Sequence, residues 1–255
     1  MQSVGRLVLV MLTVVIAGIL VTRSYYRNIN RSVDPRIVHA RELYAGYDTH
    51  AREGDYYSVF SLLDSVEAIY KATEHYRGAF EIGVIDNNRA AALLTIALYR
   101  DTIPEAADPF AGIPTDSLVS LASNHIQRAI STYEQWNLKY SDKAGEELRD
   151  MILPGFMNGL EAHDEEAVQS YLENRVKEME SAQIENDRRL SVCYSNLGLV
   201  YRYWGDYEAA ANHYMQAVEL WDRNLDAENN LNILLNKPLK KRNLIQKLFP
   251  PEREQ

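Results

Sequence analysis

The most constraining stretch of this 255-residue chain is residues 194–217, which read YSNLGLVYRYWGDYEAAANHYMQA. Small side chains at Gly198 and Ala210 lie on either side of a Gly-Asp-Tyr sequence at 205–207, and tyrosines surround them. Glycine suits the end of one helix, and aspartate suits the cap of the next. The stretch therefore predicts two antiparallel helices that approach closely at Gly198 and Ala210, with aromatic side chains filling the space beside them.

The same residues fit, without a gap, the pattern W-x2-L-G-x2-Y…A-x3-F. The segment thus resembles a tetratricopeptide repeat (TPR), here a unit over 191–224. Its structural positions are Tyr194, Leu197, Gly198, Tyr201, Gly205, Ala210, Tyr214 and Ala217. The resemblance implies an all-α fold, an array of TPR-like antiparallel helical hairpins in a right-handed superhelix. Such arrays present protein-binding surfaces rather than active sites.

A lone hairpin of this kind cannot bury its own apolar face, so stacked neighbours are required. Aligning the Gly-Asp-Tyr sequence at 54–56 with that at 205–207 gives a degenerate unit that starts at Ala40 and lacks the Leu-Gly pair. Its packing positions hold Leu43, Tyr47, Val59, Leu63 and Val66. A further unit would turn at 86–88 and continue in a helix over 90–99. Plain helical hairpins without repeat ancestry explain both stretches equally well.

Capping and proline signals divide the rest of the chain. A helix is expected from Asp34 to about Arg52, and three prolines between 101 and 115 exclude a regular helix there. Apolar spacings of three and four predict a long helix from Asp116 and an amphipathic helix over 164–187. The predicted regions are N-terminal hairpins (34–101), a Pro-rich linker (102–115), a C-terminal helical region with its capping helix (116–236) and a basic tail (237–255).

The N-terminus carries a second strong signal, an uncharged apolar run over 7–22 with Arg6 before it and three arginines soon after it. Sixteen helical residues span about 24 Å, and flanking arginines and tyrosines extend the reach toward a full bilayer crossing. A cleaved signal peptide is the alternative, but no convincing small-x-small site follows the run. We expect a single-pass membrane anchor and juxtamembrane segment over 1–31.

Membrane orientation rests on few charges. The three arginines after the run outweigh Arg6 and the amino terminus by a narrow margin, which weakly favours a cytoplasmic domain under the positive-inside rule. The solitary Cys193 excludes an internal disulfide, but it fits a reducing compartment and a disulfide-free periplasmic protein alike. Its place on a helix indicates a small core residue.

Composition and motifs argue against several functions. A net charge of −9 without a basic helical face disfavours nucleic acid. The six histidines show no metal-binding spacing, and no phosphate-binding loop or nucleophile motif is present. We therefore expect no catalytic residues, metal or cofactor.

The TPR resemblance also implies a partner-binding groove along the first helix of the repeat. By position, its residues would be Ser195, Asn196, Leu199, Arg202 and Tyr203. Some related grooves hold a partner's terminal carboxylate, but Asp226 and Asn230 stand here where such clamps carry lysine or arginine. Alternatively, Asn196 only hydrogen-bonds a neighbouring helix.

The last segment, 236–255, has six Lys/Arg against two Glu, interleaved with apolar residues. This basic tail, 237–253 above all, could contact anionic lipid or a protein, or pack on an acidic surface of its own chain.

Together the signals predict a membrane-anchored, non-catalytic TPR scaffold for a protein partner. The alternative is a ligand-binding accessory component of a transport or envelope system. An inward-facing aromatic pocket that retains a ligand would favour it.

Overall fold

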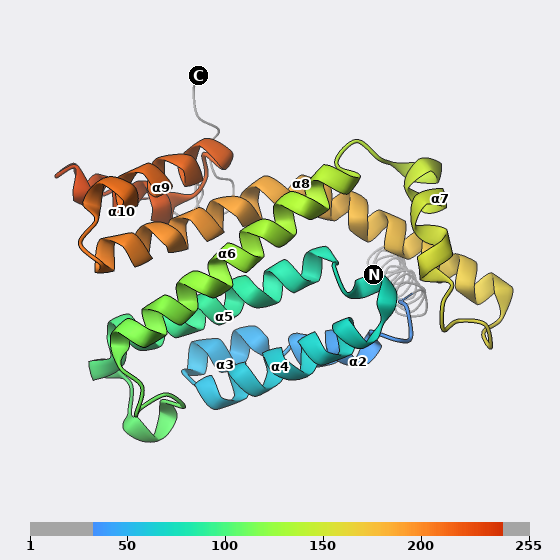
Figure 1. The fold of residues 1–255 in the computed structure, drawn as a ribbon, viewed down its shortest axis with the longest axis horizontal. Coiled ribbons are helices and arrows are strands. Elements are labelled where there is room, and N and C mark those ends of the chain that lie inside the picture. Colours follow the sequence, from blue (N-terminus) through green and yellow to red (C-terminus); the bar gives the residue numbers. More distant parts are fainter. Residues whose placement is uncertain (1–32, 242–255) are drawn as a thin grey trace, which may run out of the picture.

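The computed structural model describes residues 33–241, and every regular element within them is helical (Figure 1). The predicted all-α class is confirmed for this part of the chain. The helices are α2 (Val38–Tyr44), α3 (Tyr47–Glu53), α4 (Tyr56–Ala72), α5 (Phe80–Tyr99), α6 (Thr115–Tyr140), α7 (Gly145–Phe156), α8 (Glu165–Tyr203), α9 (Tyr207–Leu220) and α10 (Leu225–Leu234), with short 3-10 turns at Glu74–Tyr76, Arg100–Thr102 and Glu105–Ala107.

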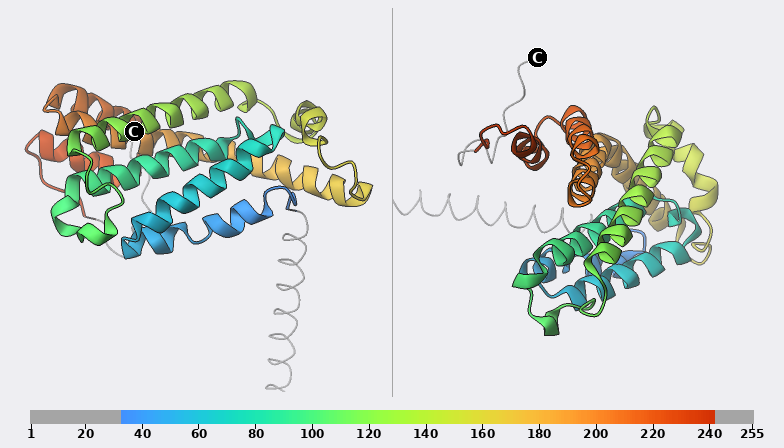
Figure 2. Two further views of the ribbon diagram at one scale, coloured as in Figure 1. Left: turned by 60° about the horizontal axis from the view of Figure 1, so that its bottom comes forward. Right: turned by 60° about the vertical axis from the view of Figure 1, so that its left-hand side comes forward.

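Helix α8 runs the length of the molecule and organises the rest. The antiparallel pair α5 and α6 packs against it, α7 lies beside its N-terminal half, and α9 and α10 lie along its C-terminal half (Figures 1 and 2). Helices α2–α4 cover the side of α5 away from α6. One apolar core extends from Ile37 to Val200, so the regions before and after residues 102–115 share their interior.

The predicted hairpin over 194–217 is observed as the end of α8 and the whole of α9. A Cβ placed on Gly198 would overlap the ring of Tyr214, so only glycine fits at this helix crossing. Ala210, Tyr214 and Ala217 are fully buried. The turn has Gly205 at φ 79°, and Asp206 caps α9 by accepting a hydrogen bond from the Ala209 amide at 3.0 Å.

The amphipathic segment 164–187 continues into this hairpin without a break. Helix α8 has 39 residues and begins at the Asp164 cap, whose carboxylate accepts from the Ala167 amide at 3.3 Å. Val168, Leu172, Val176 and Met179 form the predicted apolar stripe and are buried. The helix is therefore far longer than the first helix of an ordinary repeat.

At the N-terminal end, the single helix expected over 34–52 is wrong. It is divided into α2 and α3 at Ala45 and Gly46, where glycine's low helix propensity favours a change of direction. The predicted end at Gly54 is confirmed by a left-handed φ of 71°, and Asp55 caps α4 through the Ser58 amide. No side chain of α3 is fully buried, but Tyr47 and Ala51 pack partly against the core.

The turn expected at 86–88 is also wrong, because α5 is continuous through it. Other helices satisfy the polar side chains that suggested a turn. Asp86 accepts from Arg128 at 2.9 Å and lies 2.7 Å from the His125 ring nitrogen, while Asn88 donates to the Tyr44 hydroxyl at 2.7 Å. Burial would raise the pKa of Asp86, but His125 and Arg128 hold it below its usual value.

The Pro-rich segment between α5 and α6 is folded onto the core. Asp108 is buried; its carboxylate accepts from the Phe110 amide at 2.7 Å and from Arg100 at 3.1 Å. The Phe110 ring packs edge-on against Phe60, with their centroids 4.9 Å apart. The prolines thus end one helix and begin another without separating two cores.

The predicted anchor at 7–22 and tail residues 242–255 lie outside the described residues. None of the helices within 33–241 has the length and apolarity that a bilayer crossing requires. Lys240, in the described part of the tail, folds back on α10: its backbone amide donates to Asn229 at 2.8 Å and its ammonium pairs with Glu228 at 2.7 Å.

Candidate functional site

Three of the five predicted groove residues line one surface cavity at the C-terminal end of α8. Leu199, Arg202 and Tyr203 face a space of about 310 Å³, which Leu98 and Tyr99 of α5 and Asn230 of α10 complete. The cavity therefore forms where three helices meet, two of them adjacent in the predicted array and one from the first half of the chain.

Two tyrosines on different helices of this cavity, here called the groove, differ in their surroundings: Tyr203 is hydrogen-bonded and Tyr99 is exposed. The Tyr203 hydroxyl donates to Asp116 at the start of α6 at 2.5 Å, and this bond raises the pKa of the phenol. Tyr99, in contrast, is 61% exposed. Aromatic walls beside a guanidinium and an amide are typical of surfaces that bind peptide segments.

The other two predicted groove residues do not line this cavity. Ser195 is buried. The Asn196 side-chain amide donates to the Oδ1 oxygen of Asn87 in α5 at 3.0 Å. The Cys193 thiol donates to the same Asn87 oxygen at 3.4 Å. Asn196 therefore joins α8 to α5, as the structural alternative expected. Cys193 is a buried core residue, and burial raises the pKa of its thiol above its usual value.

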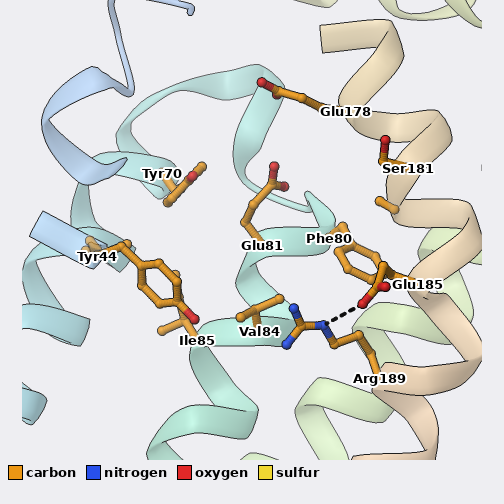
Figure 3. Close-up of a pocket in the computed structure, with 12 residues that line it drawn as sticks. Tyr44, Tyr70, Phe80, Glu81, Val84, Ile85, Glu178, Ser181, Glu185 and Arg189 are labelled. Atoms are coloured by element: carbon orange, nitrogen blue, oxygen red, sulfur yellow. Dashed lines mark ion pairs between the residues drawn. The ribbon is translucent and has the colours of Figure 1, made fainter. Parts of the chain in front are cut away.

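A second cavity, of about 270 Å³, lies between α2, α4, α5 and α8 (Figure 3). Its walls are mostly apolar and include three aromatic rings, one from each of α2, α4 and α5. Acidic side chains and one arginine complete them. The lining residues are Tyr44, Val66, Tyr70, Phe80, Glu81, Val84, Ile85, Glu178, Ser181, Ala182, Glu185 and Arg189.

Ion pairs close one end of this aromatic cavity. Arg175, which is 3% exposed, pairs with Glu81 at 2.6 Å, and Arg41 pairs with Glu178 at the same distance. Burial would raise the pKa of Glu81, but the Arg175 charge and hydrogen bond hold it below its usual value. Glu81 and Glu178 in the wall thus each have an arginine partner, and Glu185 has one in Arg188.

No local sequence pattern indicates this cavity. Its aromatic and charged residues come from four helices and from positions more than a hundred residues apart, so no motif brings them together. Within residues 33–241, no group of histidine, cysteine, aspartate or glutamate is arranged to hold a metal ion.

Comparison with known proteins does not assign the chain to a family. No protein-family model, curated protein or solved structure matches the chain.

Proposed function

We propose that this protein is a non-catalytic scaffold that binds a protein partner in the groove at the end of α8. The observation that carries the proposal is the convergence of Leu199, Arg202 and Tyr203 on one cavity with Asn230. These positions were selected from the TPR resemblance alone. The geometry of the hairpin, with Gly198 packed under Tyr214, supports a TPR-like unit at 191–224.

The chemistry of the groove favours an extended peptide segment. Leu98 and Leu199 offer apolar contact area, Tyr99 and Tyr203 offer aromatic faces, and Arg202 is a donor for an acidic or carbonyl group. The interface would be of the weak or transient kind, since a cavity of about 310 Å³ accommodates a few side chains rather than a folded surface.

Tethering would raise the effect of such modest binding. An anchor at 7–22 would hold the groove at a bilayer, and confinement increases the effective concentration of the partner. The basic tail over 237–253 would add contacts with anionic lipid or with the partner. A reporter fused after Gln255 tests the single-pass topology and the side of the domain.

Cross-linking in intact cells with the full-length chain tests the groove. Proteins captured by the wild type should be lost in Arg202→Glu and Tyr203→Ala. The matched control is Arg188→Glu, an exposed position on α8 whose guanidinium stacks on Trp221 instead. If the groove variants capture the same proteins as the control, the groove is not the binding site.

A second candidate function follows from the aromatic cavity. Tyr44, Tyr70 and Phe80 line a half-open, mostly apolar cavity of about 270 Å³, which would suit a ligand of few heavy atoms. This feature favours an accessory role in which the helical domain binds a small ligand for a transport or envelope system. Retention of a ligand through purification, detected by mass spectrometry of the extracted protein, tests it.

A further inference from the structure

The aromatic cavity is lined by one arginine, Arg189, that has a buried N–H donor without a hydrogen-bond partner. Arg189 of α8 points into the cavity, and its Nε is buried with no hydrogen-bond partner (Figure 3). Its nearest carboxylate is Glu185 at 3.9 Å, beyond hydrogen-bond distance. Glu185 already accepts two hydrogen bonds from Arg188, at 2.9 and 3.2 Å.

The charges around the cavity leave this cation in excess. The lining carboxylates are Glu81, Glu178 and Glu185, and the guanidiniums that line the cavity or pair with these carboxylates are Arg41, Arg175, Arg188 and Arg189. Three of the four guanidiniums have an ion pair within 3 Å. An unpartnered donor at a half-buried site is costly, so a bound anion would be favoured there.

A second donor faces Arg189 across the cavity. The Tyr44 hydroxyl oxygen accepts from Asn88 at 2.7 Å, which leaves its own hydrogen free to donate. In Figure 3 the Tyr44 ring and the Arg189 guanidinium point toward each other. The Arg189 charge acts on the Tyr44 phenol, since it opposes the rise in pKa that burial causes.

The rest of the cavity is apolar. Val66, Phe80, Val84 and Ile85 provide aliphatic and aromatic surface between the Arg189 end and the ion pairs of Glu81 and Glu178. We propose that this cavity binds a small carboxylate with an apolar or aromatic body, the carboxylate held by Arg189 and Tyr44. The proposal rests on the second candidate function, that the cavity binds a small ligand.

Titration calorimetry on the full-length chain tests this assignment with three probes of one shape: 3-phenylpropionate, 3-phenylpropionamide and 3-phenylpropylamine. The acid should bind one molecule per chain, at least about tenfold more tightly than the amide, because charge-assisted hydrogen bonds are the stronger ones. The amine should bind most weakly. Arg189→Gln should weaken acid binding by about tenfold or more and leave amide binding within about twofold.

Two further variants separate the site from the rest of the surface. Lys177→Gln removes a charge from an exposed position on the same helix that does not line the cavity, and it should leave acid binding within about twofold. Val84→Trp should fill the space and abolish binding of both acid and amide. A thermal melt of each variant shows whether it is folded.

The outcomes are distinguishable. Equal binding of acid and amide, with both abolished by Val84→Trp, would overturn the carboxylate assignment and leave ligand binding in place. Tightest binding of the amine would assign the site to a cation at the glutamates instead. Absence of binding for all three probes would overturn the carboxylate assignment and the second candidate function together.

Discussion

Two hairpins in this protein are closed by the same tripeptide, Gly-Asp-Tyr, at 54–56 and at 205–207, yet their helices pack differently. Both turns place glycine at a left-handed φ, 71° and 79°, and both aspartates cap the next helix. In the second hairpin Gly198 lets Tyr214 approach its helix. In the first hairpin, the corresponding pair is Tyr47 and Leu63.

The first hairpin has Tyr47 where the second has Gly198, and no side chain of α3 is fully buried, although Tyr47 and Ala51 pack partly against the core. Val59, Leu63 and Val66 on α4 are nonetheless as buried as their counterparts on α9, because they pack on the common core. The two turns thus share one backbone geometry, whereas the close aromatic approach is found only in the hairpin that has glycine at the crossing.

Ion pairs connect the N-terminal helices α2–α5, the first region of the molecule, to α8. Arg175 of α8 is nearly fully buried, bonds to Glu81 at 2.6 Å, and lies over the Tyr76 ring at 4.6 Å. We expect Arg175→Met to give the largest loss, roughly 3 kcal/mol of unfolding free energy, because it leaves the Glu81 carboxylate without its main partner.

Urea denaturation of the full-length chain measures this loss. The control is Arg188→Met on the same helix, where the side chain is 51% exposed and the expected change is below about 1 kcal/mol. Equal effects at the two positions would show that burial of the ion pair is not what holds the first region to α8.

The crossing at Gly198 has a counterpart in α5, where a Cβ on Gly83 would come within 2.7 Å of the Tyr133 ring. Gly198→Ala and Gly83→Ala should each destabilise the fold by roughly 1–3 kcal/mol, since both rings are fully buried and cannot move aside. The overlap at Gly198 is the closer one, so Gly198→Ala should have the larger effect in thermal melts.

Gly155 is the matched control for these two. It lies in α7 with open space around its Cβ position, so Gly155→Ala should stabilise by up to about 1 kcal/mol through helix propensity. A loss at Gly155 similar to that at Gly198 would contradict the close-packing explanation.

The two glycine crossings also show what the sequence could predict. The Gly198 crossing joins helices separated by a three-residue turn, so its whole pattern lies within 194–217 and was recognisable. The Gly83 crossing joins α5 to α6 across the Pro-rich linker, and nothing near Gly83 in the sequence indicates Tyr133 as its neighbour. The aromatic cavity escaped prediction for the same reason.

The polar run at 86–88 failed as a turn signal because partners far away in the sequence satisfy it. His125 and Arg128 of α6 bind Asp86, and Asn196 of α8 binds Asn87. Local propensity favoured a turn, and tertiary hydrogen bonds stabilised the helix instead. The bond between Asn196 and Asn87 supports the structural alternative for Asn196, in which it links α8 to α5.

Acid should weaken the contact between α8 and the N-terminal helices that His75 joins. Burial, with the Arg175 and Arg36 charges, lowers the pKa of His75 to about 3, and the neutral ring accepts from Arg175 at 3.2 Å. A folded-state pKa below the unfolded value of about 6.5 gives stability that is fully present above pH 6.5 and lost as the pH falls toward 3.

We expect this linkage to cost roughly 1–2 kcal/mol between pH 7 and pH 5. His75→Gln, whose amide oxygen can still accept from Arg175, should flatten the profile measured by chemical denaturation across that range. His39→Gln on the exposed face of α2 serves as the control and should leave the profile unchanged. A wild-type slope retained in His75→Gln would assign the acid sensitivity to another group.

The smallest expected difference, close to zero, is the one between the two Gly-Asp-Tyr turns. Gly54 and Gly205 both have positive φ, and a Cβ at either position would meet nothing within 4 Å. The cost of alanine is then backbone strain alone, about 1–2 kcal/mol at each position and equal within error. Thermal melts of Gly54→Ala and Gly205→Ala, compared with the double variant, measure it. A larger loss of stability at Gly205 would mean that the close packing of α8 on α9 also depends on the conformation of the turn at 205–207. The cost of alanine there would then include lost packing as well as local backbone strain.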